Sequence, residues 1–491
     1  MISHVIIVVA FFLSGSIQVH SEAIPSIVIV GSGPSGIAAA TKLLKNGYTN
    51  LLILEAENRI GGRINSIKFG DAFIDLGAEY CHGEKDNIVY SLAKDLDVLR
   101  HSDSQIHFLR SNGEILDGST ANKIIEFEES LEADETSKEN CRNVSSIGEC
   151  LEIKSKLFPK SATNSNQSEI FQEAYEWIKN SLSALDSPFD LNDLNITSNY
   201  TKCGGDLGMN WNGQNQLPID DKILLRKEVA NITNWNESTL IVTTTDGDKY
   251  EAGHVIFTAS LGVLKADHEK LFKPILPENK IKAIKNIGFG AILKIVMRFS
   301  GNWWRNNSSW PLIWTTKDIQ KLKQANLEWL TAISGIIRGE NNTKVLIAWF
   351  AGKYIPYIET LSEEEIKNGV TYTLNAFFSP HYNVTPPEEI IRTTWYSNPH
   401  FRGTYSYESV RGYLAGGSNL PELLAEPLLK SDDTPSLLFA GEATHSHYFS
   451  TVHGAIESGY REANRLINFY IQGKHNHIHT KKPHPLNMIT V

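Results

Sequence analysis

The pattern of apolar and polar residues near the start of the chain predicts a strand, a helix and a second strand in close succession. Residues Ile27–Val30 form a short apolar run rich in β-branched side chains, which is typical of a parallel strand covered on both faces. The helix is expected over Ile37–Leu44, with Gly47 as its stop signal. Leu51–Leu54 is expected to form the second strand. This order predicts an α/β fold.

The next part of the chain has a different character. Residues 90–200 are polar and have a helical pattern. We interpret the acidic stretch from Glu126 to Glu139 as a solvated helix face. Residues 160–168 are rich in Ser, Asn and Thr and are expected to form a loop.

Strand patterns return in the second half. Three strands are predicted, with Asp246-Gly247 as the turn of a hairpin, at Ile223–Ile232, Thr239–Thr244 and His254–Thr258. The last pattern is a strand from Leu437, a loop, and then a long helix. The apolar stripe of this helix contains Ala455, Ile456, Gly459, Ala463, Leu466 and Ile467.

Glycines between the first strand and the first helix carry candidate chemistry. Gly31, Gly33 and Gly36 form a G-x-G-x-x-G turn, in which they allow the tight turn, the approach of a pyrophosphate and close packing of helix on strand. The N–H groups at the start of the helix then face the phosphates. Glu55 follows Gly36 by 19 positions, where a carboxylate takes the ribose hydroxyls. We interpret this stretch as a dinucleotide-binding site; the alternative is a glycine turn in another α/β unit.

Composition limits the remaining possibilities. A chain of 491 residues is expected to form about two or three domains. The net charge of −10 argues against nucleic acid as a partner. No motif indicates metal catalysis or a serine or cysteine nucleophile. Among the four cysteines, Cys141 and Cys150 can close a small loop in an oxidising compartment, but the sequence does not fix their connectivity.

The first residues resemble a secretory signal. Val5–Leu13 is an apolar core too short to span a bilayer, and small residues follow at Ser21–Ala23. Positive charge before this core is sparse, so an uncleaved anchor is the alternative. Sequons for N-glycosylation begin at Asn143, Asn166, Asn195, Asn199, Asn231, Asn236, Asn306, Asn307, Asn341 and Asn383. We therefore expect a secreted, glycosylated protein without stable membrane insertion.

Residues after Glu55 identify the nucleotide. The spacing of Arg59, Gly61, Gly62 and Arg63 resembles the second dinucleotide-contact motif of the FAD-containing amine oxidase family. In this family the paired glycines let the chain pass close to the pyrophosphate, and the second arginine lies near it. The resemblance, which extends over nearly the whole mature chain, implies FAD rather than NAD as the cofactor.

Two further segments resemble animal polyamine and spermine oxidases. Residues 75–83 (DLGAEYCHG) resemble the family segment G-A-x-W-x-H-G, with Tyr80 where tryptophan is usual, and residues 395–407 (WYSNPHFRGTYSY) resemble another. The resemblance implies that Gly77 and Ala78 pass along the flavin. It also implies that His82 enters the substrate cavity, where it can hydrogen-bond a substrate amine. The alternative for His82 is a residue that only caps a turn.

The same resemblance implies roles for three side chains. Lys294 stands alone in an apolar, strand-like run, where a buried ammonium is costly without a purpose. The family role is a lysine that holds a water beside flavin N5, and the alternative is an edge-strand lysine that reaches solvent. Tyr405 is expected to form one wall of an aromatic cage around the reactive amine. Thr451 is expected on the opposite side, and a threonine there resembles spermine oxidases.

Further cofactor contacts are implied by the family alone. Val229 is expected to contact the adenine through its backbone, Glu442 to lie near the ribitol, and the helix N-terminus near Val452 to face the flavin pyrimidine. The complete set implied to bind FAD is Gly31, Gly33, Ser35, Gly36, Glu55, Ala56, Gly62, Arg63, Gly77, Ala78, Glu79, Tyr80, Val229, Gly441, Glu442, Thr451 and Val452.

The resemblance implies an FAD-binding Rossmann-like domain with an inserted α+β substrate-binding domain. After a signal at residues 1–23, the FAD-binding domain is expected in 24–90, 223–285 and 401–472, and the substrate-binding domain in 91–222 and 286–400. A disordered, solvated tail is expected at 473–491, and metal binding is the alternative for His475, His477, His479 and His484. We expect a monomer or a weak oligomer.

The reaction implied by the family is hydride transfer from the carbon next to an amine nitrogen to flavin N5. The imine hydrolyses to an aldehyde and a smaller amine, and oxygen reoxidises the flavin to give hydrogen peroxide. Spermine or N1-acetylated polyamines are the expected substrates. One alternative is an oxidase of another amine or of L-amino acids, with Arg402 as the candidate carboxylate-binding residue. The other is a secreted, non-catalytic relative, because residues 203–222 form a Gly/Asn-rich connection where relatives carry an amphipathic helix.

Overall fold

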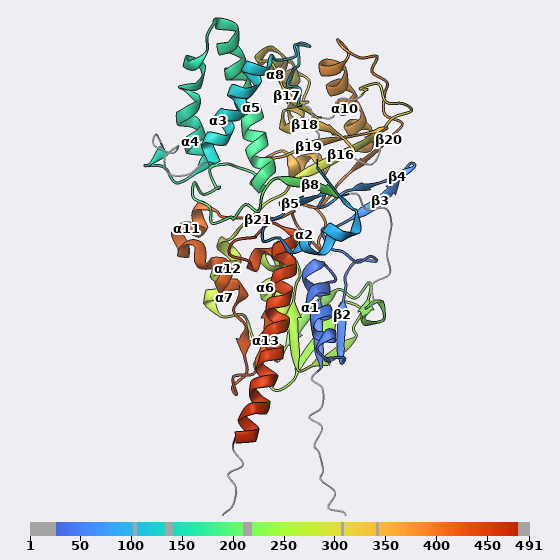
Figure 1. Cartoon of the computed structure of the whole chain (residues 1–491), viewed down its shortest axis with the longest axis vertical. Helices are drawn as coiled ribbons and strands as arrows, with labels where there is room; N and C mark the ends of the chain where they lie inside the picture. Colours follow the sequence, from blue (N-terminus) through green and yellow to red (C-terminus); the bar gives the residue numbers. More distant parts are fainter. Residues whose placement is uncertain are drawn as a thin grey trace, which may run out of the picture.

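A six-stranded sheet at one end of the molecule organises the glycine turn. The computed structural model describes residues 26–101, 106–132, 141–209, 219–305, 309–339 and 343–479. Figure 1 shows two lobes stacked along the long axis. The first lobe contains the six-stranded sheet, whose order is β22 (Leu428–Leu429), β23 (Pro435–Phe439), β13 (His254–Phe257), β1 (Ile27–Val30), β2 (Leu51–Leu54) and β9 (Ile223–Leu224). The two strands predicted at the start of the chain are confirmed.

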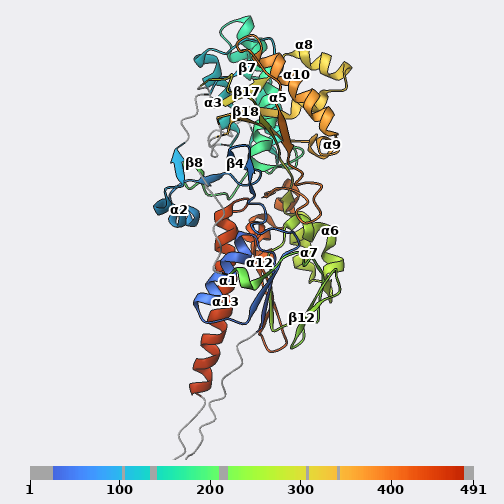
Figure 2. The ribbon, with the colours of Figure 1, turned by 90° about the vertical axis from the view of Figure 1, so that its right-hand side faces the viewer.

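Two helices cover one face of this sheet. They are α1 (Pro34–Lys45) and α13 (Val452–His479), which lie side by side in both views (Figures 1 and 2). α1 begins three residues before the predicted start, because Pro34 suits the first position of a helix. A Cβ at Gly459 would lie 2.2 Å from the Ser35 carbonyl oxygen, so the two helices meet backbone to backbone. α13 extends to His479, into the segment expected to be a disordered tail, which is therefore helical as far as that residue.

A second, four-stranded sheet lies on the opposite face (Figure 2). Its order is β12 (Lys249–Ala252), β11 (Leu240–Thr244), β10 (Val229–Thr233) and β14 (Phe272–Lys273). The predicted turn at Asp246-Gly247 joins β11 to β12. The strand predicted at His254–Thr258 is not the second arm of this hairpin, because it forms β13 in the six-stranded sheet. The single strand predicted over Ile223–Ile232 is wrong: it is split into β9 and β10, which belong to different sheets. The break falls at Arg226, whose φ of 57° interrupts an extended chain.

The second lobe is built on a mostly antiparallel sheet. Its order is β20 (Glu389–Arg392), β16 (Leu293–Arg298), β19 (Val345–Phe350), β18 (Ile333–Arg338), β17 (Ser309–Ile313) and β7 (Leu109–Arg110). Helices pack around it at α3 (Gly118–Glu132), α4 (Ile147–Ser155), α5 (Ser165–Asp186), α8 (Thr316–Gln324), α9 (Ile355–Ile358) and α10 (Glu363–Phe378) (Figure 1). The helical pattern predicted for residues 90–200 is confirmed for α3, α4 and α5.

A disulfide bond and a helix start in this lobe bear on two expectations from the sequence. Cys141, which precedes α4, forms a disulfide bond with Cys150, which lies within α4. α5 starts at Ser165, inside the segment expected to be a loop, because the side chain of Asn164 accepts the Gln167 N–H and caps the helix.

Small elements join the two lobes. The hairpin of β3 (Ser66–Phe69) and β4 (Ala72–Asp75) packs on the second lobe's sheet, with Phe69 and Ile74 against Val296. A three-stranded sheet has the order β5 (Tyr80–His82), β8 (Asp206–Met209) and β6 (Leu99–His101). The remaining elements are α2 (Ile88–Ala93), α6 (Leu261–Leu271), α7 (Glu278–Asn286), β15 (Gly288–Phe289), β21 (Ser406–Tyr407), α11 (Val410–Gly416) and α12 (Leu420–Ala425).

The connection at 203–222 is partly ordered into structure. Its first half supplies β8, which pairs with β5 and β6, and its end leads from Asp220 into β9. Ile219 is 2% exposed and packs among core residues of β1, β2 and α13. The middle, residues 210–218, lies outside the described residues, as do the predicted signal and the end of the tail. Among the described helices, none is both long and apolar enough to cross a membrane.

Candidate functional site

One cavity of about 1420 Å³ receives residues from both lobes. Nearly all residues assigned to the site by the sequence line it, including Gly31, Glu55, His82, Lys294 and Tyr405. The exception is Gly36, which lies behind the turn. A Cβ at Gly36 would lie 2.1 Å from the Gly31 carbonyl oxygen, so this glycine allows α1 to pack against β1.

The glycine turn forms a cradle at one end of the cavity. Gly33 and Gly62 face each other closely, since a Cβ at Gly62 would lie 3.1 Å from the Gly33 Cα. A side chain at either position would fill the space between the two loops. Ser35 lies in the first turn of α1 and lines the cavity, where helix N–H groups have no partner within the helix. This end of the cavity is shaped to accept an anionic group.

Glu55 ties the glycine turn to the end of β2. Its Oε2 accepts hydrogen bonds from the Ser32 N–H at 2.8 Å and from the Ser32 hydroxyl at 2.7 Å. Its Oε1 accepts the Glu57 N–H at 2.9 Å. A carboxylate offers about four acceptor positions, so this buried group keeps one for a hydroxyl in the cavity.

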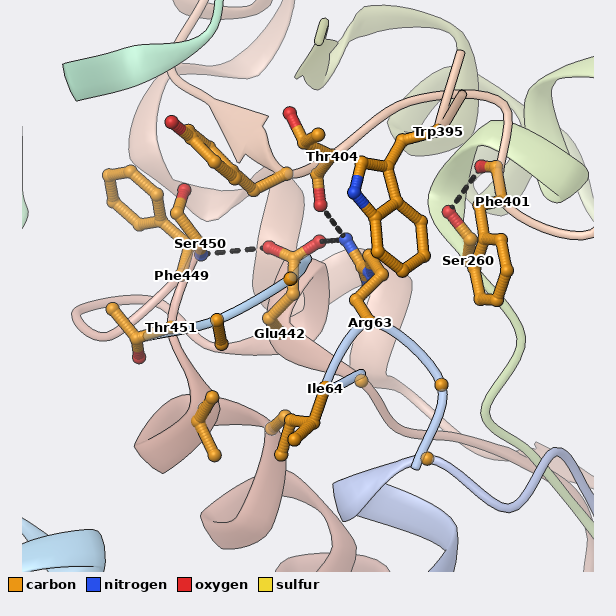
Figure 3. Close-up of a pocket in the computed structure, with 18 of the residues that line it drawn as sticks. Arg63, Ile64, Ser260, Trp395, Phe401, Thr404, Glu442, Phe449, Ser450 and Thr451 are labelled. Atoms are coloured by element: carbon orange, nitrogen blue, oxygen red, sulfur yellow. Dashed lines mark hydrogen bonds and ion pairs between the residues drawn. The ribbon is translucent and has the colours of Figure 1, made fainter. Parts of the chain in front are cut away.

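A partly buried ion pair in the cavity joins three distant segments (Figure 3). The Arg63 guanidinium donates to Glu442 Oε1 at 2.9 Å and to the Thr404 carbonyl oxygen. The other oxygen of Glu442 accepts the Ser406 hydroxyl at 2.6 Å and the Ser450 N–H at 2.8 Å. Glu442 is thus held by donors from the first, penultimate and last motifs of the chain.

Lys294 is buried and fully coordinated. Its Nζ donates to the carbonyl oxygens of Asp75 at 3.0 Å and Gly77 at 2.9 Å, and to Glu79 Oε2 at 2.7 Å. The Nζ also lies 4.5 Å from the centre of the Trp349 ring. The alternative of an edge-strand lysine is wrong, because β16 lies between β20 and β19 and the side chain is 3% exposed. Glu79, expected to bind the cofactor, lines the cavity with its carboxylate on Lys294.

His82 faces the cavity from β5. Its Nδ1 lies 2.9 Å from Asp206 Oδ1 on the paired strand β8. His82 is the last residue of β5, and its ring contacts this carboxylate and not the backbone of the turn that follows. Nearby, burial lowers the pKa of His453 to about 4, which keeps that ring neutral near neutral pH.

Tyr405 and Thr451 both line the cavity, and both hydroxyls are already occupied. The Tyr405 hydroxyl donates to the Ala184 carbonyl oxygen of α5 at 2.6 Å, and burial raises the pKa of this phenol. The Thr451 hydroxyl donates to the Tyr448 carbonyl oxygen and accepts the Gly454 N–H at 3.0 Å, so it caps α13. Only the aromatic ring of Tyr405 and the methyl group of Thr451 remain for contacts with a bound molecule.

The structure adds lining residues that the sequence did not single out. They include carboxylates and aromatic residues, among them Asp186, Asp206, Glu408, Tyr200, Trp395 and Phe449. The Trp395 N–H donates to the Leu76 carbonyl oxygen at 3.0 Å. Asp206 lies in the segment that departs from the family, and that departure was the only sequence signal for it. Arg402, the candidate for binding a carboxylate, is paired with Asp267 at 3.0 Å.

No group of three or more His, Cys, Asp or Glu side chains in the described part of the chain is arranged to hold a metal ion. The side chains of His475, His477, His479 and His484 lie outside the described residues.

The chain is similar to known amine oxidoreductases and polyamine oxidases. A family model described as "Flavin containing amine oxidoreductase" matches residues 34–467. The chain is 29% identical to "Probable polyamine oxidase 5" of Arabidopsis thaliana, over 90% of this chain and 98% of the plant protein. It is also 29% identical to "Peroxisomal N(1)-acetyl-spermine/spermidine oxidase" of Homo sapiens, over 91% of this chain and 95% of the human protein.

Among solved structures, a putrescine oxidase variant with redesigned cofactor binding is similar, with a TM-score of 0.65 at 16% identity. The match covers 90% of this chain and 99% of that chain. At this identity the likeness concerns the fold, and it confirms the predicted α/β class with a Rossmann-like FAD-binding domain and a substrate-binding domain.

The Glu442 contacts lead to a prediction. We expect Glu442→Gln to lower both the flavin content and the stability, because it leaves the Arg63 guanidinium without its carboxylate. The expected loss of stability is on the order of 2 kcal/mol. Flavin absorbance per protein and the thermal midpoint measure the two effects.

A matched control is Glu388→Gln, which removes the carboxylate that accepts from Arg298 at 2.8 Å on the surface. A pair this exposed contributes about 1 kcal/mol or less. Equal effects of the two variants would contradict the role given to Glu442.

Proposed function

Since this chain belongs to the flavin-containing amine oxidoreductase family and is an FAD-dependent amine oxidase, we propose that its substrates are polyamines. Spermine or an N1-acetylated polyamine is oxidised to an aldehyde and a shorter amine. Oxygen is the final electron acceptor, and hydrogen peroxide is the second product. The similarity to proteins named as a polyamine oxidase and an N(1)-acetyl-spermine/spermidine oxidase supports this choice.

The residues present fit FAD. The cradle of Gly33 and Gly62 leaves room for a pyrophosphate, and Glu55 keeps one acceptor position for a ribose hydroxyl. Val452, at the start of α13, lines the cavity near Glu442 and supplies the positive end of a long helix. When bound, FAD supplies the acceptor for a hydride from the carbon next to the amine nitrogen.

The observation that carries the polyamine proposal is the acidic part of the cavity. Asp186, Asp206 and Glu408 line it together with Tyr200 and Tyr405. Burial raises the pKa of Glu408, while the Asn199 N–H donates to this carboxylate at 2.8 Å. A substrate with several ammonium groups would place its distal charges among these carboxylates.

The aromatic residues act at the reacting end of the substrate. The Tyr405 ring is fixed by its hydrogen bond to Ala184, and Phe449 is 4% exposed. Such surfaces exclude water and disfavour a charged amine, so the amine loses its proton on entering. In this proposal His82, held by Asp206, hydrogen-bonds an amine group of the substrate. The side chains thereby orient the C–H bond for transfer.

Anaerobic addition of spermine tests the proposal directly. We expect the purified protein to show flavin absorbance that bleaches when spermine or N1-acetylspermine is added. Exposure to air should restore the oxidised spectrum and produce hydrogen peroxide. Bound flavin that stays oxidised with every polyamine would overturn the substrate proposal. A protein without flavin would instead contradict the assignment as an FAD enzyme.

A second prediction concerns the acidic part of the cavity. We expect Glu408→Gln to raise the KM for spermine several-fold, with a smaller change for a monoamine, because one distal charge loses its counter-charge. Steady-state kinetics at two salt concentrations measure this effect. Glu364→Gln, at an exposed position of α10, is the control for the same chemical change. An unchanged KM for spermine would contradict binding of a distal ammonium at Glu408.

We also propose that the protein is secreted and glycosylated. The disulfide between Cys141 and Cys150 supports an oxidising compartment. Five sequon asparagines lie exposed at Asn143, Asn166, Asn199, Asn236 and Asn383. Asn195 does not fit, because it is 6% exposed and its amide donates to Thr197. Asn306, Asn307 and Asn341 lie outside the described residues.

Expression in a eukaryotic secretory host tests this proposal. We expect the protein in the medium, with a mass that falls after treatment with peptide N-glycosidase. Asn383→Gln should remove one glycan, because this position is exposed. Asn195→Gln should leave the number of glycans unchanged. Retention in the cell without glycans would contradict secretion.

A further inference from the structure

A buried carboxylate approaches the buried lysine of the cavity and is not used by the proposed substrate contacts. Glu79 Oε2 lies 2.7 Å from Lys294 Nζ, and the two side chains are 8% and 3% exposed. Both residues line the cavity. An ammonium removed from water is stable only with a counter-charge and acceptors for its N–H groups. Glu79 provides both in a single contact.

The geometry around Lys294 leaves this side chain no free donor. An ammonium has three N–H bonds, and here they are directed to two backbone carbonyls and to Glu79. The Trp349 ring covers another side of the Nζ at 4.5 Å. Among the three acceptors, only Glu79 is a side chain, so it is the one that can rotate away.

We propose that Glu79 is a positioning residue that acts through Lys294. It holds the lysine as an ammonium ion and fixes the direction of its N–H bonds. A water or another group in the cavity can accept an N–H of Lys294 only when the Glu79 carboxylate gives up its own contact. The charge presented to the bound cofactor is therefore set by a pair of residues and not by the lysine alone.

The other charged groups near the Glu79–Lys294 pair contact different residues. Asp75, at the end of β4, is the second carboxylate near this pair, and its side chain accepts the Ser66 hydroxyl. Burial raises the pKa of Asp75 to about 6, and the negative charge of Glu79 adds to this rise. Arg63 is directed to Glu442, and His82 to Asp206. Glu79 is thus the only carboxylate in direct contact with Lys294 among the described residues.

This arrangement gives a signed prediction for Glu79→Gln. Without the carboxylate, the buried ammonium loses its counter-charge and keeps only uncharged acceptors, two of them backbone carbonyls, so Lys294 should release its proton at a lower pH than in the unaltered protein. Asp75 limits the change, because it ionises more readily once Glu79 is neutral. The double variant Asp75→Asn/Glu79→Gln should therefore show the larger shift.

The experiment is a pH titration of flavin absorbance in the holoenzyme without substrate. We expect an ionisation step in Glu79→Gln that is shifted to lower pH relative to the unaltered protein. Lys294→Met/Glu79→Gln should abolish the step, which assigns it to the lysine. Glu79→Asp keeps the charge at a longer distance and should give a smaller shift. Glu79→Asp also provides the test of the proposal if Glu79→Gln does not fold.

The control is a second buried ion pair, Arg110 with Glu173, whose side chains are 4% and 1% exposed and do not line the cavity. Glu173→Gln should lower the thermal midpoint without moving the flavin titration. The proposal is overturned if Glu79→Gln titrates like the unaltered protein, or if the shifted step persists in Lys294→Met/Glu79→Gln. It requires bound FAD but not the polyamine substrate, so its failure and that of the proposed function are separate outcomes.

Discussion

The structure of the site depends on one carboxylate that receives hydrogen bonds from three parts of the chain. Glu442 is 4% exposed and binds Arg63, Ser406 and Ser450. Arg63 directly follows Gly61 and Gly62, Ser406 lies in the segment that carries Tyr405, and Ser450 precedes α13. A charge so deeply buried is tolerated only when all its contacts are in place. The folded chain therefore brings the cradle, the aromatic wall and the helix start to fixed relative positions.

The same principle explains why the two lobes meet at the cavity. Lys294 belongs to the sheet of the second lobe, yet its three acceptors lie at the end of β4 and in the loop that follows it. The ion pair with Glu79 thus connects the sheet to the wall of the cavity. Buried carboxylates thus lie at both contacts, Glu442 with Arg63 and Glu79 with Lys294, beside lobe interiors that consist mainly of apolar clusters.

Local patterns made part of this structure predictable. The glycine turn, the two first strands and the carboxylate at Glu55 follow from residues within thirty positions of one another, so periodicity and spacing are sufficient. An isolated lysine in an apolar strand indicated that Lys294 is buried for a purpose. The capping role of Thr451 also follows from local sequence, because threonine before a helix is a common N-cap.

Contacts between distant segments were not predictable in the same way. The break at Arg226 sends β9 and β10 to different sheets, although the sequence looks like one continuous strand. The pairing of Glu79 with Lys294 depends on the relative position of a loop and a sheet more than two hundred residues apart. No period in the sequence encodes such a distance. Only the assembled fold brings the Glu79 carboxylate of the segment 75–83 into contact with Lys294.

The unusual connection at 203–222 shows how a local change is absorbed. Its first part pairs with β5 in a register that places Asp206 opposite His82, and a slip of one residue would turn Asp206 to the other face. Its last part buries Ile219 against the sheet and α13, so the core of the first lobe stays covered. The described ends of the connection are thus held by the pairing of β8 with β5 and by the burial of Ile219. The described part of the segment therefore shapes the wall of the cavity through Asp206, which contacts His82.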